Sequence, residues 1–181
     1  MNERPDVGDI WLIVRDGLPD RFGITAEEYF EAGWQHWMGS PRGIEFQDIT
    51  ITCFERSAKM GYDRAMIFLA HLYRDYGMMD EYYRWILEAA MMGEDGSAFL
   101  ELGELYFTGE YVHRDYKKAY QYFMTANEFG AHRCKYYLAY FADRGILESR
   151  DEETAIRYYL EGAKEYDERC WKRLKELGVE Y

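Results

Sequence analysis

Hydrophobic positions recur at steps of three to four residues through most of the chain, a period that predicts amphipathic α-helices. The predicted helices come in pairs, and a small residue opens the first helix of each pair. These small residues, at Ala65, Ala98, Cys134 and Cys170, are 33 or 36 residues apart. Such a period is typical of stacked helical repeats. The pattern therefore predicts an all-α array of helix pairs.

The expected ends of the helices follow the same repeat. Gly109 and Gly145 each end a first helix, and Asp115 and Asp151 follow six residues later, where an aspartate can cap the next helix. Between these ends, Gly103 lies at the centre of a first helix, where a small residue allows the partner helix to come close.

The repeat is most complete in its third copy. Its small, apolar, turn and capping positions are Ala98, Leu102, Gly103, Tyr106, Gly109, Val112, Asp115, Lys118, Ala119, Tyr122, Phe123, Ala126 and Gly130. This pattern resembles the Sel1-like repeat family, relatives of tetratricopeptide repeats, over residues 26–178. The resemblance implies a right-handed superhelical solenoid of antiparallel helix pairs, with about four repeats and a C-terminal capping helix. It also implies a role in protein–protein assembly, often in bacterial systems.

Residues 1–24 do not fit the repeat, and we expect them to form an N-terminal cap next to one repeat domain at 25–181. The apolar run from Ile10 to Val14 is too short to distinguish a strand from a helix. We expect it to cover the hydrophobic face of the first repeat. Pairing with another chain in a homodimer is the alternative.

Charge and composition restrict the partners. The net charge of −12 argues against nucleic acid and favours a basic partner protein, although solubility alone also explains it. No segment approaches the roughly 20 apolar residues that span a membrane, which predicts a soluble, cytoplasmic protein. Of the three cysteines, Cys134 and Cys170 occupy alanine positions of the repeat, so we expect buried thiols and no disulfide.

Motifs that would indicate catalysis or cofactor binding are absent from the sequence, and we expect no enzyme, no cofactor and no metal. The four histidines have no i, i+4 pair, and His132 and Cys134 beside a turn are weak evidence for a metal. A hydrolase would need titratable groups that converge in a pocket, such as His71 beside Glu104.

Candidate partner-binding residues lie one or two positions from the packing residues of each first helix, on the expected concave side. They are Phe30, Trp34, Trp37, Arg64, Ile67, His71, Arg74, Leu100, Glu104, Phe107, Arg133, Tyr136, Tyr140 and Asp143, with Arg169 and Lys172 added by the capping helix. Rings and arginines are enriched in interface hot spots. For Trp34 and Trp37 the alternative is packing against residues 1–24.

The leading hypothesis is a non-enzymatic protein-interaction module that binds a partner protein or peptide in its concave groove. Within that class, a bacterial adaptor or an immunity or antitoxin-type inhibitor suits a small, acidic repeat domain. A structural homo-oligomer and a hydrolase are the alternatives.

Overall fold

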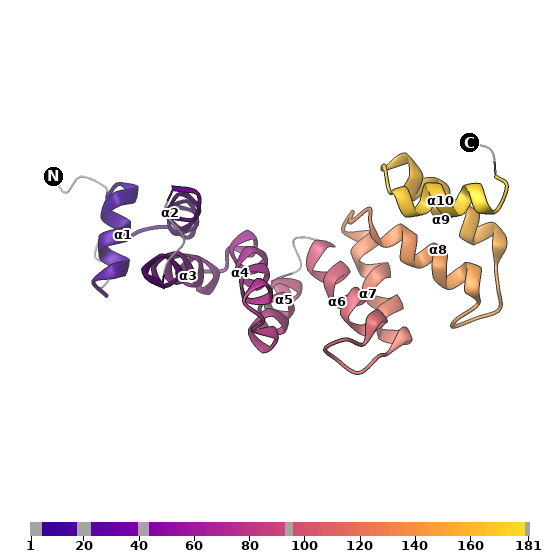
Figure 1. The fold of residues 1–181 in the computed structure, drawn as a ribbon, viewed down its shortest axis with the longest axis horizontal. Coiled ribbons are helices and arrows are strands. Elements are labelled where there is room, and N and C mark those ends of the chain that lie inside the picture. The colour runs from indigo at the N-terminus through magenta and orange to yellow at the C-terminus, as the bar shows by residue number, and fades with distance from the viewer. Residues whose placement is uncertain (1–4, 18–22, 40–43, 93–95, 180–181) are drawn as a thin grey trace. The chain divides into compact units, whose positions relative to one another are not determined.

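The computed structural model describes residues 5–17, 23–39, 44–92 and 96–179, with the side chains of 44–48 excepted. Across these ranges it is all-helical and contains no strand. The ten helices, labelled in Figure 1, are α1 (Val7–Arg15), α2 (Ala26–Gly39), α3 (Ile44–Lys59), α4 (Asp63–Asp75), α5 (Met79–Met92), α6 (Gly96–Thr108), α7 (Tyr116–Glu128), α8 (Cys134–Arg144), α9 (Glu152–Lys164) and α10 (Glu168–Glu176).

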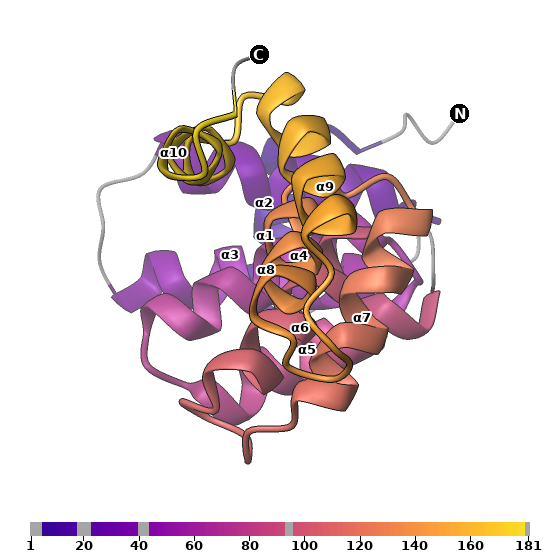
Figure 2. The ribbon, with the colours of Figure 1, turned by 90° about the vertical axis from the view of Figure 1, so that its right-hand side faces the viewer.

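The chain divides into two compact units, Met1–Met92 and Gly93–Tyr181. In the first unit α2 packs on α3, α3 on α4 and α4 on α5, and α1 contacts both α2 and α3. In the second unit each of the helices from α6 to α10 packs on the next one along the chain, which Figures 1 and 2 show from two directions. Each unit is therefore a stack of helix pairs. The expectation of one continuous repeat domain stays a prediction.

The N-terminal apolar run is a helix. Asp6 and Asp9 form a capping box at its start, in which each side chain accepts a hydrogen bond from the other residue's backbone N–H. Ile10, Ile13 and Val14 are buried in an apolar cluster that α1 shares with α2 and α3. α1 thus packs on α2 and α3, and the role of residues 1–24 as a cap stays a prediction.

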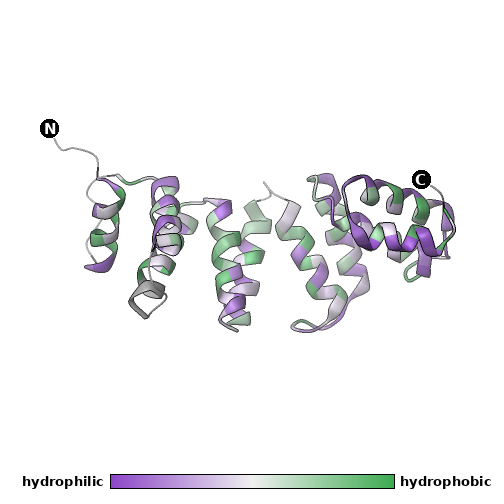
Figure 3. Ribbon diagram, turned by 45° about the horizontal axis from the view of Figure 1, so that its top comes forward, coloured by the Kyte–Doolittle hydropathy of each residue, from purple (hydrophilic) through white to green (hydrophobic). Residues whose placement is uncertain are grey.

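The repeat positions behave as the spacing predicts. The four small residues that mark the period, Ala65, Ala98, Cys134 and Cys170, are all buried. Asp115 and Asp151 cap α7 and α9, each accepting a hydrogen bond from the backbone N–H three residues on. Figure 3 shows purple and green residues interspersed along the helices, as expected where polar and apolar positions recur with the helical period.

Gly103 brings α6 and α7 together. A Cβ at this position would lie 2.5 Å from the ring of Phe123, so no larger residue fits without movement of that ring. Phe123 is itself fully buried in the cluster that joins α6, α7 and α8. The packing of α6 on α7 thus depends on the absence of a side chain at Gly103.

All three cysteines, Cys53, Cys134 and Cys170, are free and buried. For Cys134 and Cys170, burial is what their alanine positions in the repeat predict. No described helix combines the length and the apolar character that a membrane span requires.

Candidate functional site

Five side chains on α6 and α8 form a continuous surface in the second unit, which we call the aromatic strip: Glu104, Phe107, Tyr136, Tyr137 and Tyr140. The ring of Phe107 lies 5.3 Å from that of Tyr137 and 5.6 Å from that of Tyr140. The Tyr137 hydroxyl donates a hydrogen bond of 2.9 Å to Glu104. All five side chains are partly exposed. Four of them were predicted to contact a partner, and the fold brings those four together.

The repeat explains this juxtaposition. Because α6 and α8 are the first helices of consecutive repeats, residues 36 positions apart, such as Glu104 and Tyr140, occupy equivalent places on neighbouring helices. Tyr137 was missed because one side of its ring stacks on buried Phe123, at 4.4 Å and nearly parallel. The sequence feature that could have indicated Tyr137 is its position directly after Tyr136, since adjacent residues of a helix cover adjacent parts of its surface.

Arg169 of α10 extends the strip. Its guanidinium lies 4.3 Å from the ring centroid of Tyr136 and 5.1 Å from that of Tyr137, within the range of cation–π attraction. Asp167, which caps α10, holds the same guanidinium at 2.6 Å. Burial raises the pKa of the Asp167 carboxyl, but its bonds to Arg169 outweigh this and hold that pKa below the usual range. Both groups are therefore charged at neutral pH.

A cleft of about 260 Å³ opens beside the strip, and we call it the α8–α10 cleft. Side chains of α8, α9 and α10 line it: Tyr136, Tyr140, Arg144, Tyr159, Arg169, Lys172, Arg173 and Glu176. One of these residues, Arg173, forms an ion pair with buried Asp143 of α8, whose oxygen is 2.8 Å from the guanidinium nitrogen. Arg173 also bonds to Glu176 at 2.9 Å.

Two of the residues predicted to contact a partner belong to the interior instead. Leu100 is 6% exposed and packs in the cluster around Phe123 and Leu138, because its side of α6 is covered by α7 and α8. Asp143 is 4% exposed because Arg173 covers it. For these two positions the expected place on the surface is wrong.

The tyrosines of the strip are hydrogen-bond donors rather than bases. Burial raises the pKa of Tyr136, and burial together with the nearby carboxylate of Glu104 raises that of Tyr137 to about 12. Both phenols therefore stay protonated at neutral pH. Ring faces, phenol donors and fixed cations suit the recognition of a polypeptide that presents apolar and carbonyl or carboxylate groups.

The first unit has an aromatic cluster of its own. The rings of Trp34 and Trp37 on α2 lie 5.2 and 6.0 Å from that of Phe68 on α4, and Phe30 lies 6.4 Å from it. Both tryptophans thus have a packing partner outside residues 1–24, while Trp11 of α1 donates a hydrogen bond to the Ala32 carbonyl. Sequence reasoning missed Phe68, which adjoins the predicted Ile67.

The remaining predicted positions lie on α4 and at the start of α8. Arg64 is exposed with its guanidinium 5.6 Å from the Phe30 ring, and Arg74 is exposed beside Asp75. Ile67 and His71 are partly buried on α4, and Arg133 is exposed at the start of α8. His71 belongs to the first unit and Glu104 to the second.

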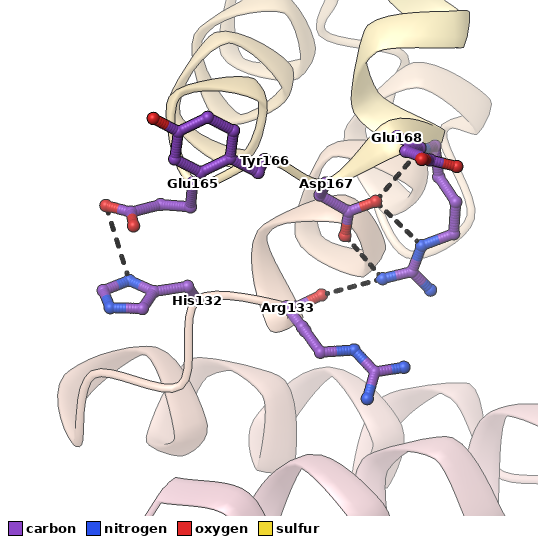
Figure 4. Close-up of a pocket in the computed structure, with 7 residues that line it drawn as sticks. His132, Arg133, Glu165, Tyr166, Asp167 and Glu168 are labelled. Carbon is purple, nitrogen blue, oxygen red and sulfur yellow. Dashed lines mark hydrogen bonds and ion pairs between the residues drawn. The ribbon is translucent and has the colours of Figure 1, made fainter.

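Two further cavities lie in the second unit. One of about 380 Å³ separates the loops that precede α8 and α10; there His132 and Glu165 point toward each other at 3.7 Å (Figure 4). The other, of about 570 Å³, lies between α7, α8 and α9 and is lined in part by Tyr120 and Tyr158. Within the described ranges, no group of three or more His, Cys, Asp or Glu could hold a metal ion.

Solved structures resemble this fold. A Sel1 repeat protein from Oxalobacter formigenes aligns with a TM-score of 0.69 and 20% identity, over 91% of this chain and 72% of that one. The protective antigen c5321 of uropathogenic Escherichia coli, described as having an SLR fold, aligns with a TM-score of 0.75 and 20% identity. That alignment covers 97% of this chain but 38% of the antigen.

A third structure, immunity protein PA5088 from Pseudomonas aeruginosa, aligns at a TM-score of 0.40 and 18% identity, over 93% of this chain and 72% of that one, a likeness too low to carry an argument. No model of a known family and no curated protein matches the sequence. The chain therefore has the fold of Sel1-like repeat proteins, as its repeat positions predict.

Proposed function

We propose that this protein is a non-enzymatic protein-interaction module, which binds a partner protein or peptide on the aromatic strip and the adjoining α8–α10 cleft. The observation that carries the proposal is the continuous row of partly exposed rings, with the guanidinium of Arg169, that α6, α8 and α10 build. Tyrosine and arginine are the residue types that most often dominate binding energy at interfaces.

The charge of the chain supports a narrower proposal. A net charge of −12 attracts a basic partner at long range, and a small acidic repeat domain suits a cytoplasmic bacterial adaptor or an immunity or antitoxin-type inhibitor. Association with such a partner slows as salt is raised, because screening weakens steering. Stopped-flow association rates at several salt concentrations measure this, and a rate independent of salt contradicts the basic partner.

The test of the proposed surface compares matched double variants of the full chain. Tyr136→Ala with Tyr140→Ala removes two rings of the strip and should reduce capture of the partner from a lysate of the native host at least tenfold. Tyr136→Phe with Tyr140→Phe retains the rings and should keep most of the capture. Tyr76→Ala with Tyr166→Ala removes two exposed rings outside the strip and serves as the control.

Thermal melting by circular dichroism separates binding from folding. A strip variant that keeps its melting temperature and loses capture supports the proposal. Equal capture by all variants contradicts it. A symmetric homodimer in solution that captures no other protein would favour the structural homo-oligomer instead.

A further inference from the structure

The α8–α10 cleft reverses the charge balance of the chain. The whole sequence has 34 acidic and 22 basic residues, yet the cleft is lined by four cations, Arg144, Arg169, Lys172 and Arg173, and one acid, Glu176. The overall composition therefore does not explain why cations are in excess in the cleft.

Two of the four cations are already neutralised. Arg169 is paired with Asp167, and Arg173 is paired with Asp143 and with Glu176. Arg144 and Lys172 make no ion pair with any described residue, and both side chains are exposed. Their positive charge is thus available to a ligand in the cleft.

The two available cations lie on helices that are joined to each other. Arg144 ends α8, and its guanidinium lies 5.6 Å from the ring centroid of Tyr140. Lys172 lies on α10, 36 residues after Tyr136 and therefore beside it in the stack. The Arg173–Asp143 ion pair joins the two helices, so the spacing of the helices that carry the two cations is set before a ligand arrives, which lowers the cost of binding.

The helix dipole explains only part of this arrangement. A cation in the last turn of α8 is favoured whatever the protein binds, which accounts for Arg144 alone. Lys172 lies in the middle of α10, where the dipole gives no such preference.

We infer that the cleft receives an acidic side chain, aspartate or glutamate, of the partner polypeptide. Its carboxylate lies between Arg144 and Lys172, and an adjacent apolar side chain rests on the rings of Tyr136 and Tyr140. A volume of about 260 Å³ is below the roughly 300–1,000 Å³ of pockets for drug-sized ligands and suits one or two side chains.

The inference of an acidic side chain in the cleft rests on the proposed function, in which the partner is a polypeptide. It is compatible with a partner of net positive charge, because the two effects act over different distances. The net charge of the chain acts at the range of diffusion, whereas contacts in the cleft act within the screening length of about 8 Å at physiological salt. A basic partner with one acidic anchor satisfies both.

The test uses the full chain and two fluorescent peptides without terminal charges. One has the sequence Gly-Ser-Phe-Glu-Glu-Leu-Ser-Gly, and the other has glutamine at both glutamates. Fluorescence anisotropy should show the glutamate peptide binding about tenfold or more tightly than the glutamine peptide, since charge-assisted hydrogen bonds are about twice as strong as neutral ones.

Substitutions in the cleft assign that preference to named residues. Arg144→Glu and Lys172→Glu should each remove the preference, whereas Lys164→Glu, an exposed lysine on α9 outside the cleft, should keep it. Glu176→Gln should tighten the glutamate peptide several-fold, because it removes the one acid that lines the cleft. If a charge reversal unfolds the chain, Arg144→Gln and Lys172→Gln replace it.

Three results overturn the inference. They are equal or absent binding of the two peptides by the unaltered chain, a preference unchanged in the charge reversals, and displacement of the glutamate peptide by inorganic phosphate at equal concentration, which marks a general anion site. None of them affects the capture measured with the Tyr136 and Tyr140 variants, so the inference and the proposed function can fail separately.

Discussion

Single small residues set how closely the helices pair. A Cβ at Gly103 would lie 2.5 Å from the Phe123 ring, and one at Gly33 would lie 3.0 Å from the Phe54 ring. Both glycines lie inside a first helix, where alanine is intrinsically favoured by about 1 kcal/mol. At Gly33 the Cβ of Cys53 would also lie 3.1 Å away. The two positions therefore differ mainly in how close the nearest neighbouring atoms would be.

This difference predicts unequal effects of one substitution. Gly103→Ala should lower the free energy of unfolding by about 1–2 kcal/mol. Overpacking costs about 1–3 kcal/mol, and the higher helix propensity of alanine offsets part of that cost. Gly33→Ala should change the free energy of unfolding by less than about 0.5 kcal/mol because the gap is wider. Urea unfolding followed by circular dichroism measures both, and an equal or reversed order contradicts the argument.

Tyr166 is the one described residue other than glycine with a positive φ, at 63°, and its side chain is 88% exposed. It lies 36 residues after Gly130, which ends α7 with a φ of 80°, so a tyrosine stands where the preceding repeat has glycine.

Tyr166→Gly should stabilise the protein by about 0.5–1 kcal/mol, because relief of a left-handed backbone that costs about 1–2 kcal/mol exceeds the added chain entropy. The matched change Gly130→Ala should destabilise it by about 1 kcal/mol. Melting temperatures of the two variants and the unaltered chain measure these changes in stability. A lower melting temperature of Tyr166→Gly would show that the exposed ring contributes to folding.

The sequence predicts residues that follow the period better than residues that depend on a distant partner. Tyr136 and Tyr140 follow from their offset to the packing positions. Asp143 has the same offset, yet it is buried because Arg173, 30 residues later, pairs with it. An ion pair between separate helices leaves no periodic signal, so neither Arg173 nor the cleft that it braces could be predicted.

At the scale of elements, the helix ends are the most predictable feature. Asp115 and Asp151 act on the backbone three residues ahead, and such local interactions are visible in the sequence. The state of the N-terminal segment was not predictable from its apolar run, because five apolar residues fit a strand or a helix. The capping box of Asp6 and Asp9 was the local signal for a helix.

The packing of α1 predicts a contrast between two neighbouring positions. Ile13→Ala should cost about 2–5 kcal/mol, because it leaves a cavity among α1, α2 and α3. Leu12→Ala, on the exposed side of the same helix, should cost less than about 1 kcal/mol. Urea unfolding of both variants tests this, and similar losses would show that α1 is not held by its buried side.

At the scale of the molecule, each unit has an apolar core of its own. The first unit contains a cluster among α1, α2 and α3 and further buried apolar residues on α4 and α5, and the second unit contains one cluster around Phe123 and another around Tyr159. In repeat proteins stability comes mainly from contacts between neighbouring repeats. The period predicted this stacking, but nothing in it predicted a division at Met92 and Gly93.

A fragment of residues 93–181 should therefore fold alone. We expect a helical circular dichroism spectrum and a single cooperative urea transition, because α6 to α10 pack on one another in chain order and the clusters around Phe123 and Tyr159 lie within these helices. The fragment 1–92 is the matched comparison. A non-cooperative transition in 93–181 would show that its stability depends on the rest of the chain.

The buried thiols make this protein convenient for site-directed labelling. Burial raises the pKa of Cys53 to about 12, that of Cys134 to about 11 and that of Cys170 to about 12, so almost no thiolate is present at neutral pH. A cysteine introduced at the exposed position of Lys172 would react with a maleimide dye far faster than the native three. The unaltered background can thus carry an environment-sensitive fluorophore at the mouth of the cleft.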